Sequence, residues 1–135
     1  MHKERCSTLN KELIQLQRNA NSTCVIVTND DFDNIKPKVV MKADIADKFL
    51  FSSNPPIFSD GINKTCKKSK LAYLVITNID ALPAEEQNKY VGLVKDREMK
   101  GYYLPNNCII VFTVKSKESL KNISKELYHF AVVAF

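Results

Sequence analysis

Glycine is scarce in this chain. Its 135 residues include three glycines, Gly61, Gly92 and Gly101, and no tryptophan. A loop that cradles a triphosphate follows the pattern G-x-x-x-x-G-K-[ST], because its backbone must approach the phosphates closely. No two glycines of this sequence have that spacing. We therefore expect no intact machinery for nucleotide hydrolysis and no bound cofactor.

Long apolar runs and paired cysteines are also missing. The apolar runs 71–76 and 108–114 fall far short of the roughly 20 residues that cross a bilayer. The charged start of the chain is not followed by the apolar stretch of a signal peptide, so we expect none. No C-x-x-C pair occurs, so neither a disulfide framework nor a zinc site is expected from Cys6, Cys24, Cys66 and Cys108. These absences favour a reducing, cytoplasmic location and no membrane partner.

Positive charge is what the chain has in excess. The net charge is +5, with 20 Lys and Arg residues against 15 Asp and Glu residues. The lysines concentrate in the segments 64–70 and 115–125. A basic surface can hold phosphates, which makes candidates of Lys64, Lys67, Lys68 and Lys70. No helix-turn-helix or aromatic RNA-binding motif accompanies them, so we favour a solvated lysine-rich face.

Short apolar runs alternate with helical patterns along the chain. Strands are expected at 23–28, 71–77, 108–114 and 130–135, with shorter ones at 39–42 and 49–51. Helices are expected at 7–19, 84–100 and 117–127, with a helical turn at 43–48. Continuous apolar strands between helices indicate a single α/β domain over residues 1–135. We expect three layers, with a mostly parallel sheet of about five strands and helices on both faces.

The central strands and the ligand-binding edge follow from this arrangement. Neighbouring central strands are expected to contain Val75, Ile76, Ile110 and Val111. Parallel sheets bind their ligands beyond the carboxyl ends of the strands, where loops converge. Here those loops are 28–33, 77–82 and 113–119. Any site of this protein is expected at that edge.

One segment resembles a motif of a known family. Residues 74–83, LVITNIDALP, resemble the Walker B segment of AAA+ ATPases. The helical pattern after it, the segment 100–107 and the apolar run 108–113 resemble the helix, hairpin-like insert and sensor-1 strand of the clamp-loader, magnesium-chelatase and enhancer-binding branches. Residues 123–130 are similar to the helix that ends near an arginine finger. The resemblance covers about residues 71–135. It implies a P-loop-NTPase-like fold, and a first strand between the fourth and the fifth would support it.

The chain departs from that family where catalysis takes place. A Walker B aspartate holds the magnesium shell, and the glutamate after it polarises the attacking water. Thr77 and Asn78 stand at those places, followed by Asp80. Thr113 stands at the sensor-1 position and His129 near the place of the arginine finger. The resemblance thus implies a degenerate Walker B, no enzyme activity, no catalytic or metal-binding residues and no C-terminal helical lid.

A function follows from the resemblance. Degenerate AAA+ modules occupy a place in a ring or bridge partners, so we expect a non-catalytic subunit or adaptor, in DNA replication or a mobile genetic element. Its partner is expected to be a protein or another subunit of a homo- or hetero-oligomer, and no small-molecule substrate is expected. The candidate partner surface combines basic, apolar and aromatic side chains near the end of the 84–100 helix, namely Lys95, Arg97, Met99 and Tyr102.

Two other classes of function stay open. The 64–70 lysines, with Tyr102 and Tyr103 stacking on bases, describe a nucleic-acid-binding accessory protein. A small phosphoacceptor or metal-binding signalling domain would hold magnesium at the carboxyl edge with Asp30, Asp31, Asp33 and Asp80. Turn and cap roles explain the same acids more simply. Nucleophilic catalysis by His129 with Cys24 or Cys108 is disfavoured, because both cysteines are expected to be buried.

Overall fold

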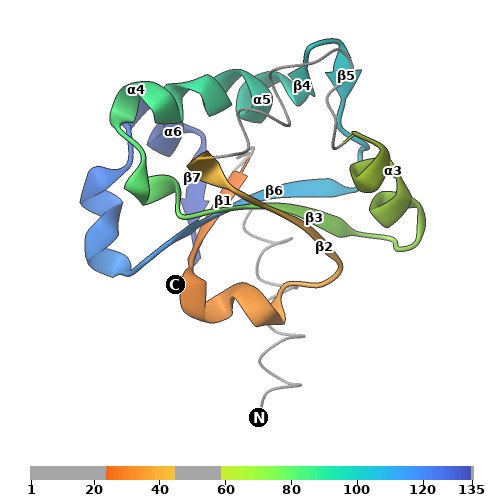
Figure 1. The fold of residues 1–135 in the computed structure, drawn as a ribbon, viewed down its shortest axis with the longest axis horizontal. Coiled ribbons are helices and arrows are strands. Elements are labelled where there is room, and N and C mark those ends of the chain that lie inside the picture. Colours follow the sequence, from red (N-terminus) through yellow and green to blue (C-terminus); the bar gives the residue numbers. More distant parts are fainter. Residues whose placement is uncertain (1–23, 45–58, 135) are drawn as a thin grey trace.

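A computed structural model describes residues 24–44 and 59–134 of the chain. The expected helix at 7–19 and the expected strand at 49–51 lie outside the described residues, as does most of the turn at 43–48. Figure 1 shows a layer of strands with helices packed against it. No helix in the described ranges is long and apolar enough to span a membrane.

Five strands form one sheet in the order β2-β3-β6-β1-β7 (Figure 1). Their bounds are Cys24–Thr28 for β1, Lys38–Lys42 for β2, Ala72–Thr77 for β3, Cys108–Val114 for β6 and Ala131–Val133 for β7. Every neighbouring pair is parallel, which confirms the predicted α/β class with its parallel sheet. The central strands β3 and β6 are buried at every residue, as expected of continuous apolar runs in a parallel sheet.

The register of the two central strands matches the sequence prediction. Leu74 lies opposite Ile110 and Val75 opposite Val111, so the four predicted core residues do lie in neighbouring strands. Side chains alternate between the two faces of the sheet. One apolar cluster therefore contains Ile110 and the other contains Val75 and Val111.

β1 lies between β6 and β7, which are the fourth and fifth strands of the sheet in chain order. This is the position of the first strand that the AAA+ resemblance implies. Receiver-type domains have the strand order 2-1-3-4-5 instead. The topology therefore differs from that of the receiver-type phosphoacceptor domains considered as an alternative.

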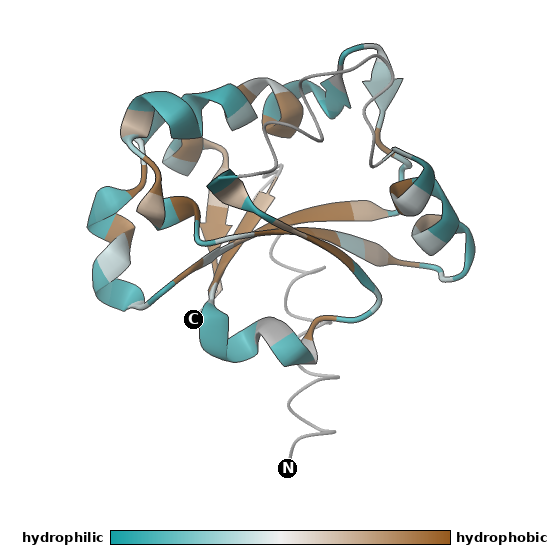
Figure 2. Ribbon diagram, in the orientation of Figure 1, coloured by the Kyte–Doolittle hydropathy of each residue, from teal (hydrophilic) through white to brown (hydrophobic). Residues whose placement is uncertain are grey.

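Most of the described helices lie on one face of the sheet. In Figure 1 the helices α3 (Ser59–Lys67), α4 (Ala84–Gln87), α5 (Val91–Asp96) and α6 (Lys125–His129) lie above the sheet, and the 3-10 helix η1 (Asn29–Asn34) lies below it. Figure 2 shows apolar strands between the hydrophilic outer sides of these helices. Tyr90 joins the helices to the sheet, because its ring meets Phe112 edge-on at 5.8 Å and its hydroxyl donates to the Ala43 carbonyl at 2.6 Å.

The prediction of one continuous helix over residues 84–100 is wrong, because only part of this range is helical. A 3-10 helix, η3 (Asn88–Tyr90), separates α4 from α5, and Arg97 ends α5 in the left-handed region at φ 56°. The chain then forms an antiparallel hairpin of β4 (Glu98–Met99) and β5 (Tyr102–Tyr103). Its turn residues, Lys100 and Gly101, have φ values of 51° and 82°, the positive signs that a tight two-residue hairpin requires. Gly101 therefore serves a hairpin turn and not a helix end.

Two other helices differ from expectation. The expected helix at 117–127 is divided into the 3-10 helix η4 (Lys117–Asn122) and α6, because Ile123 and Ser124 are extended. Ser124 instead caps α6, with its hydroxyl accepting the Leu127 N–H at 3.1 Å. Helix α3 was not expected at all. Its buried apolar side chains are limited to Ile62 and Cys66, so the helical period is hard to recognise.

Candidate functional site

The loops after β1, β3 and β6 meet at the carboxyl edge of the sheet, as predicted. The Thr113 hydroxyl, near the end of β6, donates to Asn29 Oδ1 at 2.5 Å. It also accepts the backbone N–H of Asn78 at 3.1 Å. Asn29 Nδ2 in turn donates to Asn78 Oδ1 at 2.9 Å. These three hydrogen bonds close a ring across three strand ends, which we call the polar ring (Asn29, Asn78 and Thr113).

Local backbone geometry explains why the polar ring closes. Asn78 is in the left-handed region, at φ 59° and ψ 43°, which asparagine adopts more readily than most residues. Thr113 is 0% exposed, so its hydroxyl needs partners within the protein. Asn29 was not predicted as a member of the site. The signal for Asn29 in the sequence is its place: it is a polar amide directly after an apolar strand, at the edge of the sheet where Thr113 was expected.

The chemistry of the polar ring is neutral. Two amides and one hydroxyl do not titrate near neutral pH, so none of them acts as a general base there. Thr77, at the first degenerate Walker B position, is buried at the end of β3. Of the two positions at which a Walker B motif supplies carboxylates, Asn78 joins strand ends through the polar ring and Thr77 is the last residue of β3.

Asp80 lies beside the polar ring, on the 3-10 helix η2 (Ile79–Ala81). Its Oδ2 atom accepts the backbone N–H of Lys115 at 3.4 Å. This contact links the loop after β3 to the loop after β6. The structure therefore brings Thr77, Asn78 and Thr113 together and gives Asp80 a role in joining loops.

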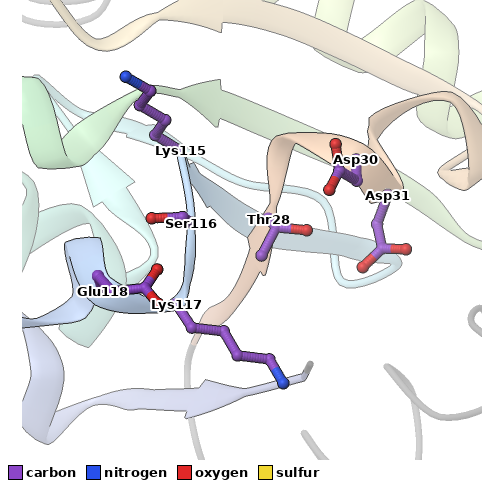
Figure 3. A pocket seen from close by; sticks show the side chains of 7 residues that line it. All are labelled: Thr28, Asp30, Asp31, Lys115, Ser116, Lys117 and Glu118. Atoms are coloured by element: carbon purple, nitrogen blue, oxygen red, sulfur yellow. The ribbon is translucent and has the colours of Figure 1, made fainter.

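A hollow of about 400 Å³ opens between η1 and the segment that follows β6 (Figure 3). Its lining residues are Thr28, Asp30, Asp31, Lys115, Ser116, Lys117 and Glu118. The two lysine side chains point to opposite sides in Figure 3, and neither reaches the aspartates. Within residues 24–44 and 59–134, no group of three or more His, Cys, Asp or Glu side chains is placed to hold a metal ion. The alternative in which Asp30, Asp31, Asp33 and Asp80 together hold a magnesium ion therefore has no support in the described residues.

A second hollow, of about 500 Å³, lies between α5 and α6. We call it the α5–α6 groove, and it is lined by Val91, Lys95, Lys125, Glu126, His129 and Phe130. Val91 and Phe130 are half-buried and pack against the larger apolar cluster, whereas Lys95 and Lys125 are exposed. The His129 ring meets the Phe130 ring edge-on, with their centroids 5.1 Å apart. The groove thus has an apolar floor and a charged rim that contains Lys95, Lys125 and Glu126.

The predicted partner surface is divided by the structure. Lys95 lines the α5–α6 groove, whereas the Arg97 guanidinium donates through Nη2 to the carbonyls of Pro105, at 2.9 Å, and Cys108, at 2.6 Å. The Tyr102 hydroxyl donates to Asn63 Oδ1 at 2.8 Å, and burial raises the pKa of Tyr102 to about 12. Met99 is the last residue of β4, in the hairpin that follows α5. Arg97 and Tyr102 therefore hold the hairpin to the domain.

The predicted phosphate-binding lysines do lie together. Lys64 and Lys67 are on α3, and Lys68 and Lys70 belong to the turn that leads into β3. All four are exposed, next to the amino edge of the sheet. This end of the domain is opposite to the polar ring.

The described cysteines are buried free thiols at positions 24, 66 and 108. Burial raises the pKa of Cys24 and of Cys108 to about 12, so both remain protonated at neutral pH. The Cys24 thiol donates to the Phe130 carbonyl at 3.6 Å. These thiols are apolar core groups, in agreement with the prediction that they are buried.

Comparison with known proteins gives no family. No family model matches the chain, and no curated protein matches it. The functional argument therefore depends on the geometry and chemistry of the site.

Proposed function

We propose that this protein is a non-catalytic AAA+-like module that works as an adaptor through contacts with other proteins. The observation that carries the proposal is the polar ring. It lies at the carboxyl edge at which the resemblance would place a magnesium ion and a water-activating carboxylate, and it joins three strand ends there through neutral groups bonded to one another. The position of β1 between β6 and β7 supports the AAA+-like assignment.

The segment after β1 supports the absence of nucleotide chemistry. Residues 29–34 form η1, with Asp30 and Asp31 in its first turn. Negative charge at this place repels a triphosphate, which is held elsewhere by N–H groups and basic side chains. The protein therefore acts without hydrolysis. We place its activity in the cytoplasm, in an assembly of DNA replication or of a mobile genetic element.

The α5–α6 groove is the contact surface that we assign to the protein partner. An apolar core with a charged rim is the usual anatomy of a protein interface. Val91 and Phe130 supply the apolar part, and Lys95 and Lys125 supply the rim without an ion pair to any described carboxylate. The groove therefore fits a partner segment with an apolar anchor flanked by acidic residues.

Site-specific crosslinking tests this surface. A photoreactive side chain placed at Lys95 should capture one defined partner protein in extract of the native host. Lys121 is also exposed but lies on η4, outside the groove, so it provides the matched control position. Equal capture from Lys95 and Lys121, or capture of no defined protein from either, would contradict the adaptor role of the groove.

Calorimetry with magnesium-ATP tests the non-catalytic assignment. We expect no saturable binding below the millimolar range and no hydrolysis above background. Thr77→Asp combined with Asn78→Glu should not create hydrolysis, because no phosphate-cradling loop is present. Saturable micromolar binding that Thr113→Val abolishes would show that the polar ring is a nucleotide site, and the proposal would fail.

A further inference from the structure

Two of the buried thiols lie against one another at the amino edge of the sheet. Cys66 is in the last turn of α3, and Cys108 is the first residue of β6. Their thiols are hydrogen-bonded to each other, and both belong to the larger apolar cluster. Figure 1 shows α3 beside the start of β6. The pair therefore joins two segments that are far apart in sequence, and neither the polar ring nor the α5–α6 groove includes it.

Backbone contacts hold the two cysteines in this position. Asn107 Nδ2 donates to the carbonyls of Cys66, at 2.7 Å, and Ser69, at 2.9 Å, which ties the end of α3 to the loop before β6. On the other side, Arg97 Nη2 donates to the Cys108 carbonyl at 2.6 Å. Because both backbones are fixed, the contact between the thiols is part of the fold. The two sulfur atoms need no large movement of the chain to reach each other.

The two thiols differ in reactivity. Cys66 is 6% exposed and Cys108 is 2% exposed, so a small reagent reaches Cys66 first. Burial raises the pKa of the Cys66 thiol, and the hydrogen bond from Cys108 and the positive charge of Arg97 offset part of this rise. Burial and the neighbouring Cys66 raise the pKa of Cys108 to about 12. Since the thiolate is the nucleophile, Cys66 is the thiol that attacks and Cys108 the one that resolves.

We propose that Cys66 and Cys108 form a redox-active dithiol, which small peroxides oxidise to a reversible disulfide within the domain. This function goes beyond the proposed protein adaptor. The oxidant must be small, because the thiol that it meets is almost fully buried. Hydrogen peroxide satisfies this condition. A sulfenic acid that forms beside a second thiol condenses with it to a disulfide.

The reaction balances in two steps. The Cys66 thiolate attacks one oxygen of hydrogen peroxide, the O–O bond breaks, and the released hydroxide takes up the proton that Cys66 lost. The Cys108 thiol then gives up its proton, and its sulfur attacks the Cys66 sulfenic acid. The S–O bond breaks, and the hydroxide that leaves combines with the Cys108 proton. The protein loses two electrons and two protons, and the peroxide becomes two water molecules.

Mass spectrometry of the full chain tests the proposal directly. The folded protein is treated with hydrogen peroxide, the remaining thiols are blocked with N-ethylmaleimide, and disulfides are located by peptide mapping without reduction. We expect one product, in which Cys66 is joined to Cys108 and no oxygen has been added. Dithiothreitol should return both thiols, because a disulfide is reducible by thiol exchange.

Matched controls come from the other thiols of the chain. Cys24 is also buried, but its thiol donates to the Phe130 carbonyl at 3.6 Å, so Cys24→Ser should leave the disulfide unchanged. Cys6→Ser, at a position outside the described residues, should leave it unchanged as well. Cys66→Ala and Cys108→Ala should each abolish it, with circular dichroism showing that the variant is folded. The mapping of the native chain does not depend on any variant.

Urea unfolding gives an independent readout. A disulfide between Cys66 and Cys108 closes the segment 67–107 into a loop in the unfolded chain, which disfavours the unfolded state. Oxidation should therefore raise the folding equilibrium constant about 30-fold or more, seen as a higher urea midpoint. Peroxide treatment of Cys66→Ala should leave its midpoint unchanged.

Four outcomes would overturn the proposal. Addition of oxygen to Cys66 without a bond to Cys108 would show that the contact is packing only. A disulfide that forms in urea but not in the folded protein would show the same. A disulfide of either residue with Cys6 or Cys24 would assign the chemistry to another pair. A lower urea midpoint after oxidation would show that the fold opposes the bond. None of these results involves the α5–α6 groove, so the adaptor function is tested separately.

Discussion

Gln87 offers a demanding test of how this domain is held together. It is 0% exposed, and its side chain forms three hydrogen bonds with backbone atoms. Nε2 donates to the carbonyls of Leu82, at 2.8 Å, and Asn122, at 2.7 Å. Oε1 accepts the N–H of Ser124 at 2.6 Å. One side chain thus connects the start of α4 to the break between η4 and α6.

Gln87→Leu keeps the volume of the side chain and removes all three hydrogen bonds. The buried Ser124 N–H, which donates to Gln87 Oε1, costs about 1–3 kcal/mol when it is left unpaired, and each carbonyl costs about 1 kcal/mol. The additional apolar surface that the leucine buries stabilises the folded state by about 1 kcal/mol. We therefore expect a loss of about 2–4 kcal/mol from a total stability of about 5–15 kcal/mol. Urea unfolding followed by circular dichroism measures this loss.

Glu85→Leu is the matched control, because Glu85 is exposed on the same helical turn. A surface substitution of this kind should change stability by no more than about 0.5 kcal/mol. If Gln87→Leu costs as little as Glu85→Leu, the three bonds contribute nothing net, and our account of the α4–α6 connection is refuted.

Gln87→Glu adds a test with a definite sign. The new carboxyl faces the carbonyls of Leu82 and Asn122. Its protonated form can donate one hydrogen bond, to one of these carbonyls, and its ionised form can donate none. Burial also disfavours the charge, so the pKa of this carboxyl in the folded state should rise above its ordinary value of about 4.3. The loss of stability relative to the native chain should be smallest below about pH 4 and should grow as the pH rises toward 7. A stability difference that is the same at both pH values would contradict the geometry.

Three further predictions concern the core, the polar ring and the thiols. Ile110→Ala should cost about 2–5 kcal/mol in urea unfolding, as truncation of a buried aliphatic side chain does, and a cost below about 1 kcal/mol would place β6 outside the core. Thr113→Val should cost about 1–3 kcal/mol and speed hydrogen exchange at the Asn78 amide, and unchanged exchange would show that the polar ring does not form. The folded protein should resist alkylation of Cys24 by iodoacetamide, because burial raises the pKa of this thiol to about 12. Fast alkylation of Cys24 in the folded protein would contradict its burial. Because the pKa of the Cys24 thiol is raised in the folded state, the stability that this thiol contributes should be intact below its unfolded pKa of about 9 and should decline as the pH rises toward 12.

The strands were predictable because burial on both faces leaves a continuous apolar run in the sequence. β1, β3 and β6 are such runs, and each was expected within one residue of its bounds. The helices were harder to predict. The apolar pattern that identifies a helix does not show that Arg97 turns left-handed or that the residues after it pair as a hairpin. Those features depend on contacts of Arg97 with Pro105 and Cys108, which no local pattern contains.

The candidate site was predictable only in part. The topology brings the ends of β1, β3 and β6 together, so Asn78 and Thr113 were expected at one edge. That Asn29 joins them depends on two side-chain hydrogen bonds that sequence alone does not specify. Gln87 was missed for a similar reason: two of its three partners, the carbonyl of Asn122 and the N–H of Ser124, are backbone atoms 35 and 37 residues away.

Helix α5 connects the groove that we assign to a protein partner with the β4–β5 hairpin. Lys95, near its end, lines the α5–α6 groove assigned to a protein partner. Arg97, two residues later, fixes the hairpin that carries Tyr103 by donating to the carbonyls of Pro105 and Cys108. A partner in the groove would therefore contact a helix whose carboxyl end is held to the loop before β6. Under the proposed adaptor role, the strand ends that the polar ring joins need no chemistry of their own, because the proposed function is binding in the groove.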